Sequence, residues 1–265
     1  MALDATPLTL ASGGLRRYVS ELSAALATEY PEDGYVLASG QRFAMPAAAP
    51  PNLAPGAGPR TRMERRWWSR GLARLVRRER IDVFHGTNFE VPVMPLAPAV
   101  LTLHDLSPWL DRAWHSGAGR VRARTPWLLG LGLATMVITP AEAIRKEAME
   151  RFRIPPNRIV AVPEAAAACF RPVDEEPAAA PYFLYAGALE PRKNLSVIVE
   201  AWRLLRRRHA VELVLAGPCR DGFEAPVQEP GLRIAGEVPD EELARLYSGA
   251  VAFLYPSLYE GFGLP

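Results

Sequence analysis

The chain has 265 residues, a formal net charge of +2 and 49% hydrophobic residues. Because a domain typically holds about 100–200 residues, this length favours two α/β domains over one small core. The small net charge gives no support to a nucleic-acid partner. Cys169 and Cys219 are far apart and lack metal-ligand spacing, which argues against zinc or a disulfide framework and fits a reducing cytoplasm. No signal peptide and no apolar run of ~18 residues is evident, so we expect a cytoplasmic protein.

The first 60 residues predict a strand, a glycine turn, a helix and a second strand. Residues 1–5 predict a buried strand, and Gly13-Gly14 opens a helix whose apolar residues recur at helical spacing. Residues 35–38 predict the second strand. The next stretch, 44–59, is dominated by Ala, Pro and Gly, so we expect a mobile, poorly ordered loop there.

The stretch 63–78 predicts a helix with one apolar and one basic side. Its apolar stripe would consist of Trp68, Leu72, Leu75 and Val76. Glu64 and Glu79 face a large excess of arginines, namely Arg60, Arg62, Arg65, Arg66, Arg70, Arg74, Arg77, Arg78 and Arg80. The simpler interpretation is a surface helix with solvated arginines. The alternative is peripheral contact with anionic lipid on the inner face of a membrane, which Trp67 and Trp68 would suit.

Strands and helices continue to alternate up to residue 170. The tetrapeptide Thr-Pro-Ala-Glu at 139–142 predicts a helix start, with Thr139 as N-cap, proline at the first helical position and Glu142 three residues after the cap. Another helix is expected around 119–134. Strands are predicted at 81–85, 100–104, 136–138 and 158–162.

A segment without periodicity, RPVDEEPAAAP at 171–181, is predicted to be an interdomain linker. The pattern then restarts with a strand at 182–186, a loop at 187–193 and a helix for which Asn194 is the predicted N-cap. The remaining elements are expected as strands at 211–216, 232–235 and 250–254 and a helix at 240–247. This alternation indicates parallel sheets. The predicted fold is α/β, with Rossmann-like doubly wound domains at 1–170 and 182–265.

Glycines and charged residues follow four of the predicted strands. They are Gly13-Gly14, His104-Asp105, Glu190-Pro191-Arg192-Lys193 and the run from Glu260 to Pro265. Two doubly wound domains commonly bind a ligand in the cleft between them, at the carboxyl ends of strands. Each group alone has a structural explanation, because a glycine pair is commonly a turn and a histidine after a strand is commonly a structural residue. Their combination predicts a ligand site.

This combination resembles the GT-B glycosyltransferases, in particular the large retaining group called family 4, or glycosyl transferases group 1. The resemblance covers almost the whole chain. Its most specific stretches are YFLYAGALEPRKNLSVIVEAW at 182–202 and GEVPDEELARLYSGAVAFLYPSLYEGFGLP at 236–265. The others are GGLRRYVSELSAAL at 13–26, IDVFHGTNFEVP at 81–92, LTLHDLSPW at 101–109, ITPAEAIRKEAMERFRIPPNRIVAVPEA at 138–165 and LVLAGP at 213–218.

The resemblance implies transfer of a sugar from a nucleotide diphosphate donor to an acceptor hydroxyl with retention of configuration. Fixed positive groups then stabilise the departing diphosphate. Lys193 matches the diphosphate-binding lysine, and Arg192 assists it, although many members place their arginine where this chain has Ala188. Glu260 matches the first glutamate of the E-x7-E motif, which binds the donor sugar, and His104 matches a histidine that contacts the same sugar. Further donor-binding residues implied are Gly13, Gly14, Gly187, Phe262, Gly263 and Leu264.

No metal or other cofactor is expected. The sequence contains no D-x-D, the metal-binding motif of the other large glycosyltransferase fold, and neither G-x-G-x-x-G nor G-x-x-x-x-G-K-[ST]. The implied partners are a nucleotide sugar and a saccharide or lipid-linked acceptor in polysaccharide or glycolipid synthesis. The Glu-Pro-Arg-Lys-Asn form resembles mannosyl- and rhamnosyltransferases. It favours mannose or a similar hexose, with GDP-mannose as the donor.

Two departures from the family pattern qualify this reading. Where members commonly carry Pro-Asn-Gly-Val, this chain has Pro163-Glu164-Ala165-Ala166, which changes the turn. The second glutamate of E-x7-E would fall three residues past Pro265, so we expect a C-terminally truncated chain with an acceptor-side domain, the linker and a partial nucleotide-sugar-binding domain. The alternatives are a noncatalytic nucleotide-sugar- or partner-binding module and a nucleotide-sugar 2-epimerase of the same fold.

Overall fold

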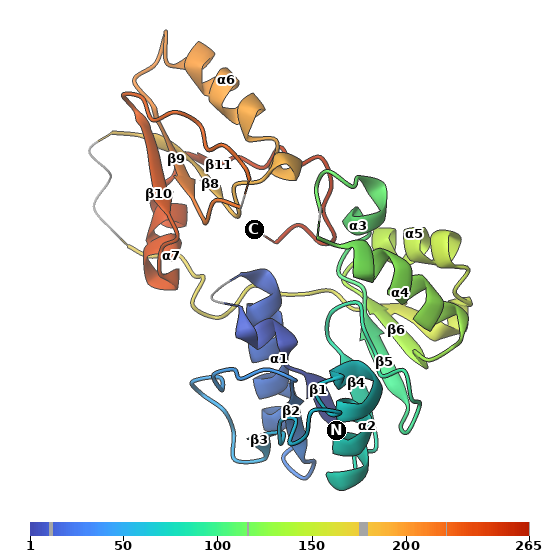
Figure 1. The fold of residues 1–265 in the computed structure, drawn as a ribbon. Helices are drawn as coiled ribbons and strands as arrows, with labels where there is room; N and C mark the ends of the chain where they lie inside the picture. The colour runs from blue at the N-terminus through green and yellow to red at the C-terminus, as the bar shows by residue number, and fades with distance from the viewer. Residues whose placement is uncertain (11–12, 116, 175–179, 221, 265) are drawn as a thin grey trace. The chain divides into compact units, whose positions relative to one another are not determined.

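The computed structural model describes residues 1–10, 13–115, 117–174, 180–220 and 222–264. The chain divides into two compact units, Met1–Glu164 and Ala165–Pro265. Each unit is built on a parallel β-sheet with helices packed against it (Figure 1). Of the predicted linker at 171–181, residues 175–179 lie outside the described residues.

The first unit contains a seven-stranded sheet in the order β3-β2-β1-β4-β5-β6-β7. Every neighbouring pair is parallel, and Leu3 in the centre lies opposite Leu37 on one side and His85 on the other. The strand order reverses between β1 and β4, which makes this the topological switch point of the sheet. The strands are β1 Ala2–Asp4, β2 Tyr35–Ala38, β3 Leu53–Pro55, β4 Phe84–Gly86, β5 Ala99–Thr102, β6 Met136–Thr139 and β7 Ile159–Ala161.

Helices cover both faces of this sheet. Ala2 and Leu3 are consecutive in β1, so their side chains point to opposite faces. Leu3 belongs to the apolar cluster that includes Val19 of α1, and Ala2 to the cluster that includes Leu72 of α2. The helices are α1 Gly14–Glu29, α2 Leu72–Arg78, α3 Ser107–Leu110, α4 Gly119–Gly130 and α5 Glu142–Phe152, with short turns η1 Thr6–Thr9, η2 Trp67–Gly71 and η3 Pro156–Arg158.

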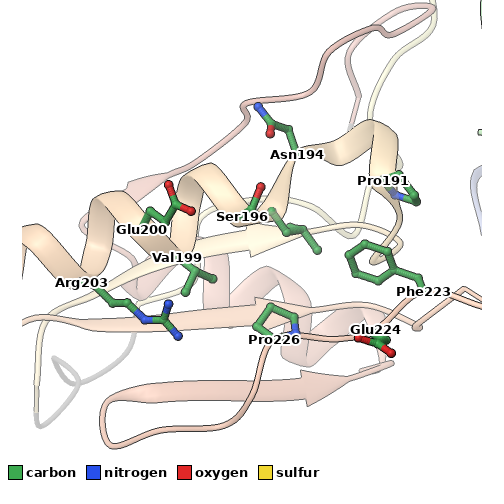
Figure 2. Close-up of a pocket in the computed structure, with 10 residues that line it drawn as sticks. Pro191, Asn194, Ser196, Val199, Glu200, Arg203, Phe223, Glu224 and Pro226 are labelled. Carbon is green, nitrogen blue, oxygen red and sulfur yellow. The ribbon is translucent and has the colours of Figure 1, made fainter.

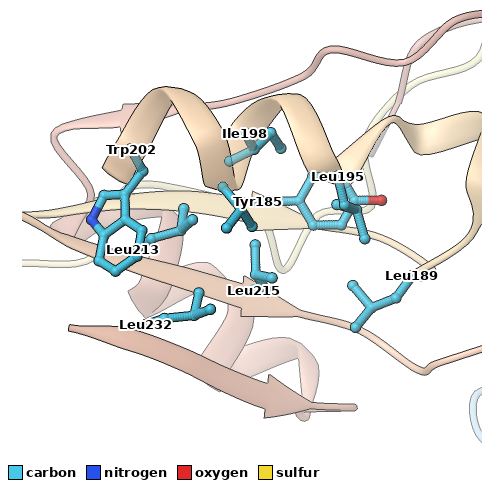
Figure 3. Close-up of a cluster of buried hydrophobic side chains, with 9 residues drawn as sticks. Tyr185, Leu189, Leu195, Ile198, Trp202, Leu213, Leu215 and Leu232 are labelled. Carbon is cyan, nitrogen blue, oxygen red and sulfur yellow. The ribbon is translucent and has the colours of Figure 1, made fainter. Parts of the chain in front are cut away.

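The second unit contains a four-stranded parallel sheet in the order β10-β9-β8-β11, with its switch point between β8 and β11. Its elements are β8 Tyr182–Ala186, η4 Pro191–Lys193, α6 Leu195–Leu205, β9 Glu212–Ala216, β10 Leu232–Gly236, α7 Asp240–Gly249 and β11 Ala252–Phe253. Ile198 and Trp202 of α6 pack on Leu213 and neighbouring strand residues (Figure 3). Leu246 of α7 packs with Leu184 in a separate cluster. The predicted α/β class with two doubly wound parallel sheets is confirmed.

Two predicted segments differ in the structure. The loop expected at 44–59 contains β3, which pairs with β2, because Leu53 is buried in the α1 cluster. Pro55 is tolerated there because β3 is an edge strand. The helix expected over 63–78 begins as a π turn at Trp67, in which Leu72 N–H donates to Trp67 O. This wider turn rotates the apolar face, so Trp67 is buried, 8% exposed, and Trp68 is only half-buried.

The predicted N-cap Thr139 is wrong, whereas Asn194 is the N-cap residue of α6 as predicted but does not cap it through its side chain. Thr139 is the last residue of β6 and its hydroxyl donates to Ala141 O at 3.2 Å, while α5 begins at Glu142 without a side-chain cap. Asn194 has a left-handed backbone, with φ of 55°, and its side chain makes no cap hydrogen bond. Its Nδ2 donates instead to Pro256 O at 3.3 Å. The amide therefore ties the start of α6 to the segment after β11.

Candidate functional site

Two loops meet at the switch point of the second sheet. The loop after β8 carries Arg192 and Lys193 in η4, and the other loop follows β11. Leu258 N donates to Arg192 O at 2.9 Å, which joins the two loops beside the Asn194–Pro256 bond. Ligands of doubly wound folds bind where the loops of a switch point open. The structure therefore brings side chains that are far apart in sequence to the expected edge of this sheet.

The side chains of these loops form a chain of ion pairs. Lys193 Nζ lies 2.5 Å from Glu260 Oε1, and Arg192 Nη1 lies 2.9 Å from Oε2 of the same carboxylate. Arg192 Nη2 lies 2.9 Å from Glu190 Oε1, whose other oxygen lies 3.1 Å from Arg220 Nε. Arg192, Lys193 and Glu190 are all buried. The predicted residues Arg192, Lys193 and Glu260 thus lie together, and Glu190, which the sequence named only as part of the same loop, extends the cluster from Arg192 to Arg220.

The electrostatics of this cluster favour an anionic ligand. Burial alone would raise the pKa of Glu260, but the hydrogen bond from Lys193 and the charges of Lys193 and Arg192 hold it below its ordinary value. Among the described residues, two carboxylates, Glu190 and Glu260, face three cations, and the third cation is Arg220, which is 65% exposed. A fixed cation at a partly desolvated edge binds an anion such as a diphosphate more strongly than the same cation in water.

We expect the Glu260 ion pairs to stabilise the second unit only above acid pH. A carboxyl group with a lowered folded-state pKa contributes stability above its ordinary value of 4.5 and loses it as the pH falls through the folded value. Glu260→Gln should therefore cost about 1–3 kcal/mol of unfolding free energy at pH 7, the scale of hydrogen bonds to charged groups. Urea unfolding of both proteins from pH 7 to pH 3 checks this. The difference between them should shrink toward pH 3, and a constant difference would contradict the assignment.

The turn after β8 depends on two glycines. Gly187 has a φ of 140° and its N–H donates to Ala216 O at 2.9 Å. Gly217, in the turn after β9, has a φ of 137°, and a Cβ there would lie 2.0 Å from Gly187 O. Because both backbones come this close, only glycine fits at position 217. The two turns therefore set the path of the chain that leads to Lys193.

The other predicted donor-binding residues lie at loop positions. Gly263 has a φ of 100°, a conformation that favours glycine, and its neighbours Phe262 and Leu264 are 38% and 41% exposed. In the first unit, Gly13 has a φ of 109° and immediately precedes α1, and Gly14 is the first residue of that helix. Both are exposed. These glycines and His104 belong to the first unit, and the remaining predicted residues belong to the second.

His104 lies at the carboxyl end of the first sheet, just after β5. Its Nε2 lies 2.8 Å from Thr87 O, in the loop after β4. The ring of Tyr18 from α1 packs edge-on against it, with centroids 4.6 Å apart. On the far side of the imidazole, Nδ1 lies 3.4 Å from Glu164 Oε1. Sequence reasoning found His104 but not its contact with Glu164, because the two are joined only by the fold.

Two buried ionisable residues at the same edge were missed. Asp4, at the end of β1, is 2% exposed, and burial raises its pKa to about 7, although Thr6 donates to it through its backbone N–H and its hydroxyl. His85 in β4 lies 2.8 Å from the Thr102 hydroxyl, and burial lowers its pKa to about 4. An ionisable residue within an otherwise apolar strand pattern is the signal that could have found both.

A groove of about 470 Å³ lies beside α6, between that helix and the loop that carries Phe223 and Pro226 (Figure 2). Neither Lys193 nor Glu260 lines it. Among the described residues that line it, the one cation is Arg203, which lies 2.7 Å from Glu229 and is neutralised by it. The groove therefore lacks the excess of positive charge found at the switch point.

Solved structures place this architecture in a class. WaaG, a glycosyltransferase involved in lipopolysaccharide biosynthesis, matches with a TM-score of 0.66 and 15% identity over 98% of this chain and 75% of its own. Anabaena HepE, solved in complex with UDP and glucose, matches with a TM-score of 0.64 and 14% identity over 99% of this chain and 75% of its own. With two doubly wound parallel sheets, the chain has the GT-B fold of such glycosyltransferases.

The chain belongs to glycosyltransferase family 4. The model described as Glycosyltransferase Family 4 matches residues 12–166, and the model described as Glycosyl transferases group 1 matches residues 170–265. The O-antigen chain mannosyltransferase B of Escherichia coli is 35% identical over 205 residues, which are 69% of this chain and 53% of that protein. The serotype-specific mannosyltransferase WbdA of Escherichia coli is 25% identical over 68% of this chain and 25% of its own length. The chain thus spans about half the length of the first relative and a quarter of the length of the second.

Proposed function

We propose that the protein transfers a hexose, with mannose favoured, from a nucleoside diphosphate donor to a saccharide hydroxyl with retention of configuration. The observation that carries this proposal is the cluster of the buried Arg192 and Lys193 with the partly exposed Glu260 at the switch point of the second sheet. Membership of family 4 and two mannosyltransferase relatives in Escherichia coli support the same reaction and a role in polysaccharide synthesis.

The cluster suits the charge that develops during transfer. As the bond between sugar and diphosphate breaks, the diphosphate gains negative charge, and a fixed cation aimed at it stabilises the transition state. Lys193 has three N–H donors, so it can keep Glu260 Oε1 and also reach a phosphate oxygen. Arg192 and Lys193 supply the positive charge that a divalent cation supplies in other diphosphate sites, so we propose that no metal is needed.

Glu260 has a second role in this proposal. Its carboxylate holds Arg192 and Lys193 in place, and it is 20% exposed, so one edge stays open to a ligand. A carboxylate is an acceptor, and sugar hydroxyls are donors. We propose that Glu260 binds a hydroxyl of the donor sugar while it positions the two cations, and that the backbone of Phe262, Gly263 and Leu264 approaches the phosphates.

A thermal-shift panel of GDP-mannose, UDP-glucose and dTDP-rhamnose tests the donor assignment. A ligand at 100 times its dissociation constant stabilises the folded state by about 2.7 kcal/mol. That corresponds to a rise in Tm of about 5–10 °C for a protein of this size. We expect the largest rise with GDP-mannose. A larger rise in Tm with another donor would assign the base and sugar of that donor instead of GDP and mannose. No rise with any of the three donors would contradict the proposal.

We further propose that the basic face of the 63–78 segment contacts anionic lipid headgroups. None of the helices in the described ranges is long and apolar enough to span a bilayer. Arg65, Arg66, Arg70 and Arg77 are exposed, while the acidic Glu64 is buried and paired with Arg74 at 2.8 Å. Trp67 is buried and Trp68 packs against Phe84, with ring centroids 6.5 Å apart. The contact we propose is therefore electrostatic, and Trp67 and Trp68, which the sequence suggested would suit a membrane interface, take no part in it.

Vesicle flotation should reveal this contact. Each arginine near an anionic surface contributes about 1 kcal/mol, so Arg65→Glu with Arg70→Glu should lower binding to phosphatidylglycerol vesicles by about 30-fold or more. Arg207→Glu with Arg208→Glu, two exposed arginines of the second unit, makes the same charge change elsewhere. Equal binding of both double variants to the vesicles would contradict the proposed contact between the 63–78 segment and lipid.

A further inference from the structure

Glu190 is the most deeply buried member of the ion-pair cluster at the switch point of the second sheet. It is 5% exposed, whereas the side chain of the other carboxylate, Glu260, is 20% exposed. Both Glu190 oxygens contact a cation, because Oε1 lies 2.9 Å from Arg192 Nη2 and Oε2 lies 3.1 Å from Arg220 Nε. The two carboxylates therefore differ in what they reach. Glu260 keeps an open edge, while Glu190 acts through the arginines that it contacts.

The backbone around Glu190 is held from both sides. The turn after β9 pairs with this loop, since Leu189 N donates to Pro218 O at 2.8 Å and Arg220 N donates to Leu189 O at 3.1 Å. On the other side, Lys193 N donates to Glu190 O at 3.1 Å. Glu190 therefore keeps a fixed backbone position, and the charge of its carboxylate stays among the cations of the cluster.

Three acceptors hold the guanidinium of Arg192. Its Nη1 donates to Tyr259 O at 2.6 Å and lies 2.9 Å from Glu260 Oε2, while Nη2 donates to Glu190. The guanidinium is thus fixed between the loops after β8 and β11 before a ligand arrives. A carboxylate that holds a cation also offsets part of its charge. Glu190 therefore has two effects on an anionic ligand, because it fixes the direction of the cation and weakens its attraction.

We propose that Glu190 is a positioning residue that orients Arg192 and Arg220 and limits how tightly the site holds the diphosphate. The same cations face the diphosphate of the donor and of the nucleoside diphosphate product, so a site without this counter-charge would hold both more tightly. Equal tightening of substrate and transition state lowers KM without raising kcat. The inference rests on the proposed function, because it takes the ligand to be a nucleoside diphosphate.

Calorimetric titration of GDP into three variants tests the inference. Glu190→Gln keeps the shape and one acceptor but removes the charge, so it should bind GDP about 3- to 30-fold more tightly than the wild type, the scale of one charge at a partly desolvated site. Glu190→Asp keeps the charge and should bind GDP nearly as the wild type does. Arg220→Gln removes the exposed cation of the pair and should weaken GDP binding by about 3- to 30-fold. A loss of packing alone would weaken GDP binding in every variant.

Glu200→Gln is the matched control. Glu200 is an exposed carboxylate of α6 in the same unit, and the same substitution there should leave GDP affinity unchanged, because solvent screens its charge. Transfer kinetics supply a second measurement. Glu190→Gln should lower KM for GDP-mannose without raising kcat, whereas a purely structural defect would raise KM.

The outcomes separate the inference from the proposed function. Weaker or unchanged GDP binding in Glu190→Gln, or an equal gain in Glu200→Gln, overturns the inference, and normal transfer by the wild type then leaves the proposed function intact. Tighter GDP binding in Glu190→Gln alone supports the inference even where the wild type transfers no sugar, which overturns the proposed function. If Glu190→Gln does not fold, undiminished GDP affinity in Arg220→Gln overturns the inference. No binding of GDP to the wild type overturns both.

Discussion

Replacing Lys193 by alanine should lower sugar transfer at least ~10²-fold, the scale of losing one preorganised charged contact to the transition state. Lys193 is buried and held 2.5 Å from Glu260, so no exposed side chain can easily take its place. The measurement is the initial rate of transfer from GDP-mannose at saturating acceptor. Because the lost interaction is strongest when the diphosphate departs, kcat should fall more than affinity for the donor.

Lys146→Ala provides the control for this variant. Lys146 is an exposed lysine of α5, and its removal should leave the rate unchanged. Glu260→Ala should lower transfer by a similar factor to Lys193→Ala, whereas Glu229→Ala removes a carboxylate of the same unit that pairs with Arg203 and should have no effect. Near-normal rates in both Lys193→Ala and Glu260→Ala would show that the switch-point cluster is not the donor site.

Replacing Gly217 by alanine should destabilise the second unit by about 2–6 kcal/mol. The left-handed backbone costs about 1–3 kcal/mol for a residue with a Cβ, and overpacking against Gly187 O costs about 1–3 kcal/mol more. Gly222→Ala is the matched control, because its φ of 77° imposes backbone strain while a Cβ there meets nothing within 4 Å. Urea unfolding of both variants isolates the steric contact. An equal loss of unfolding free energy in the two variants would mean that a Cβ at position 217 does not clash with Gly187 O.

Local sequence patterns predicted most elements of the fold but not the order of the strands. A buried strand such as Tyr182–Ala186 and an amphipathic helix such as α6 each carry their own periodicity. The contact between Lys193 and Glu260 spans 67 residues and exists only because β11 pairs with β8. The residues could therefore be named from the sequence, whereas their ion pairs required the sheet topology.

Predictions from local sequence patterns failed where a residue distant in the sequence contacts the side chain in the folded structure. Asn194 is at the N-cap position of α6 as predicted, but its side chain donates to Pro256 O, which the fold brings near, and does not cap the helix. Leu53 lies in a stretch of Ala, Pro and Gly, and its burial beneath α1 outweighs that composition. Glu164 gave no sequence signal beyond a departure from the usual turn. Its contact with His104 depends on the path of the chain after β7.

The most direct test of the account is the transfer of mannose from GDP-mannose to a mannose-terminated saccharide, followed by NMR of the new anomeric centre. It should be carried out with this 265-residue chain and with the longest chain that its reading frame encodes. The account predicts a mannosyl product with the anomeric configuration of the donor, formed without added metal and lost in Lys193→Ala. An inverted product, or conversion of the donor to its 2-epimer without transfer, would contradict it.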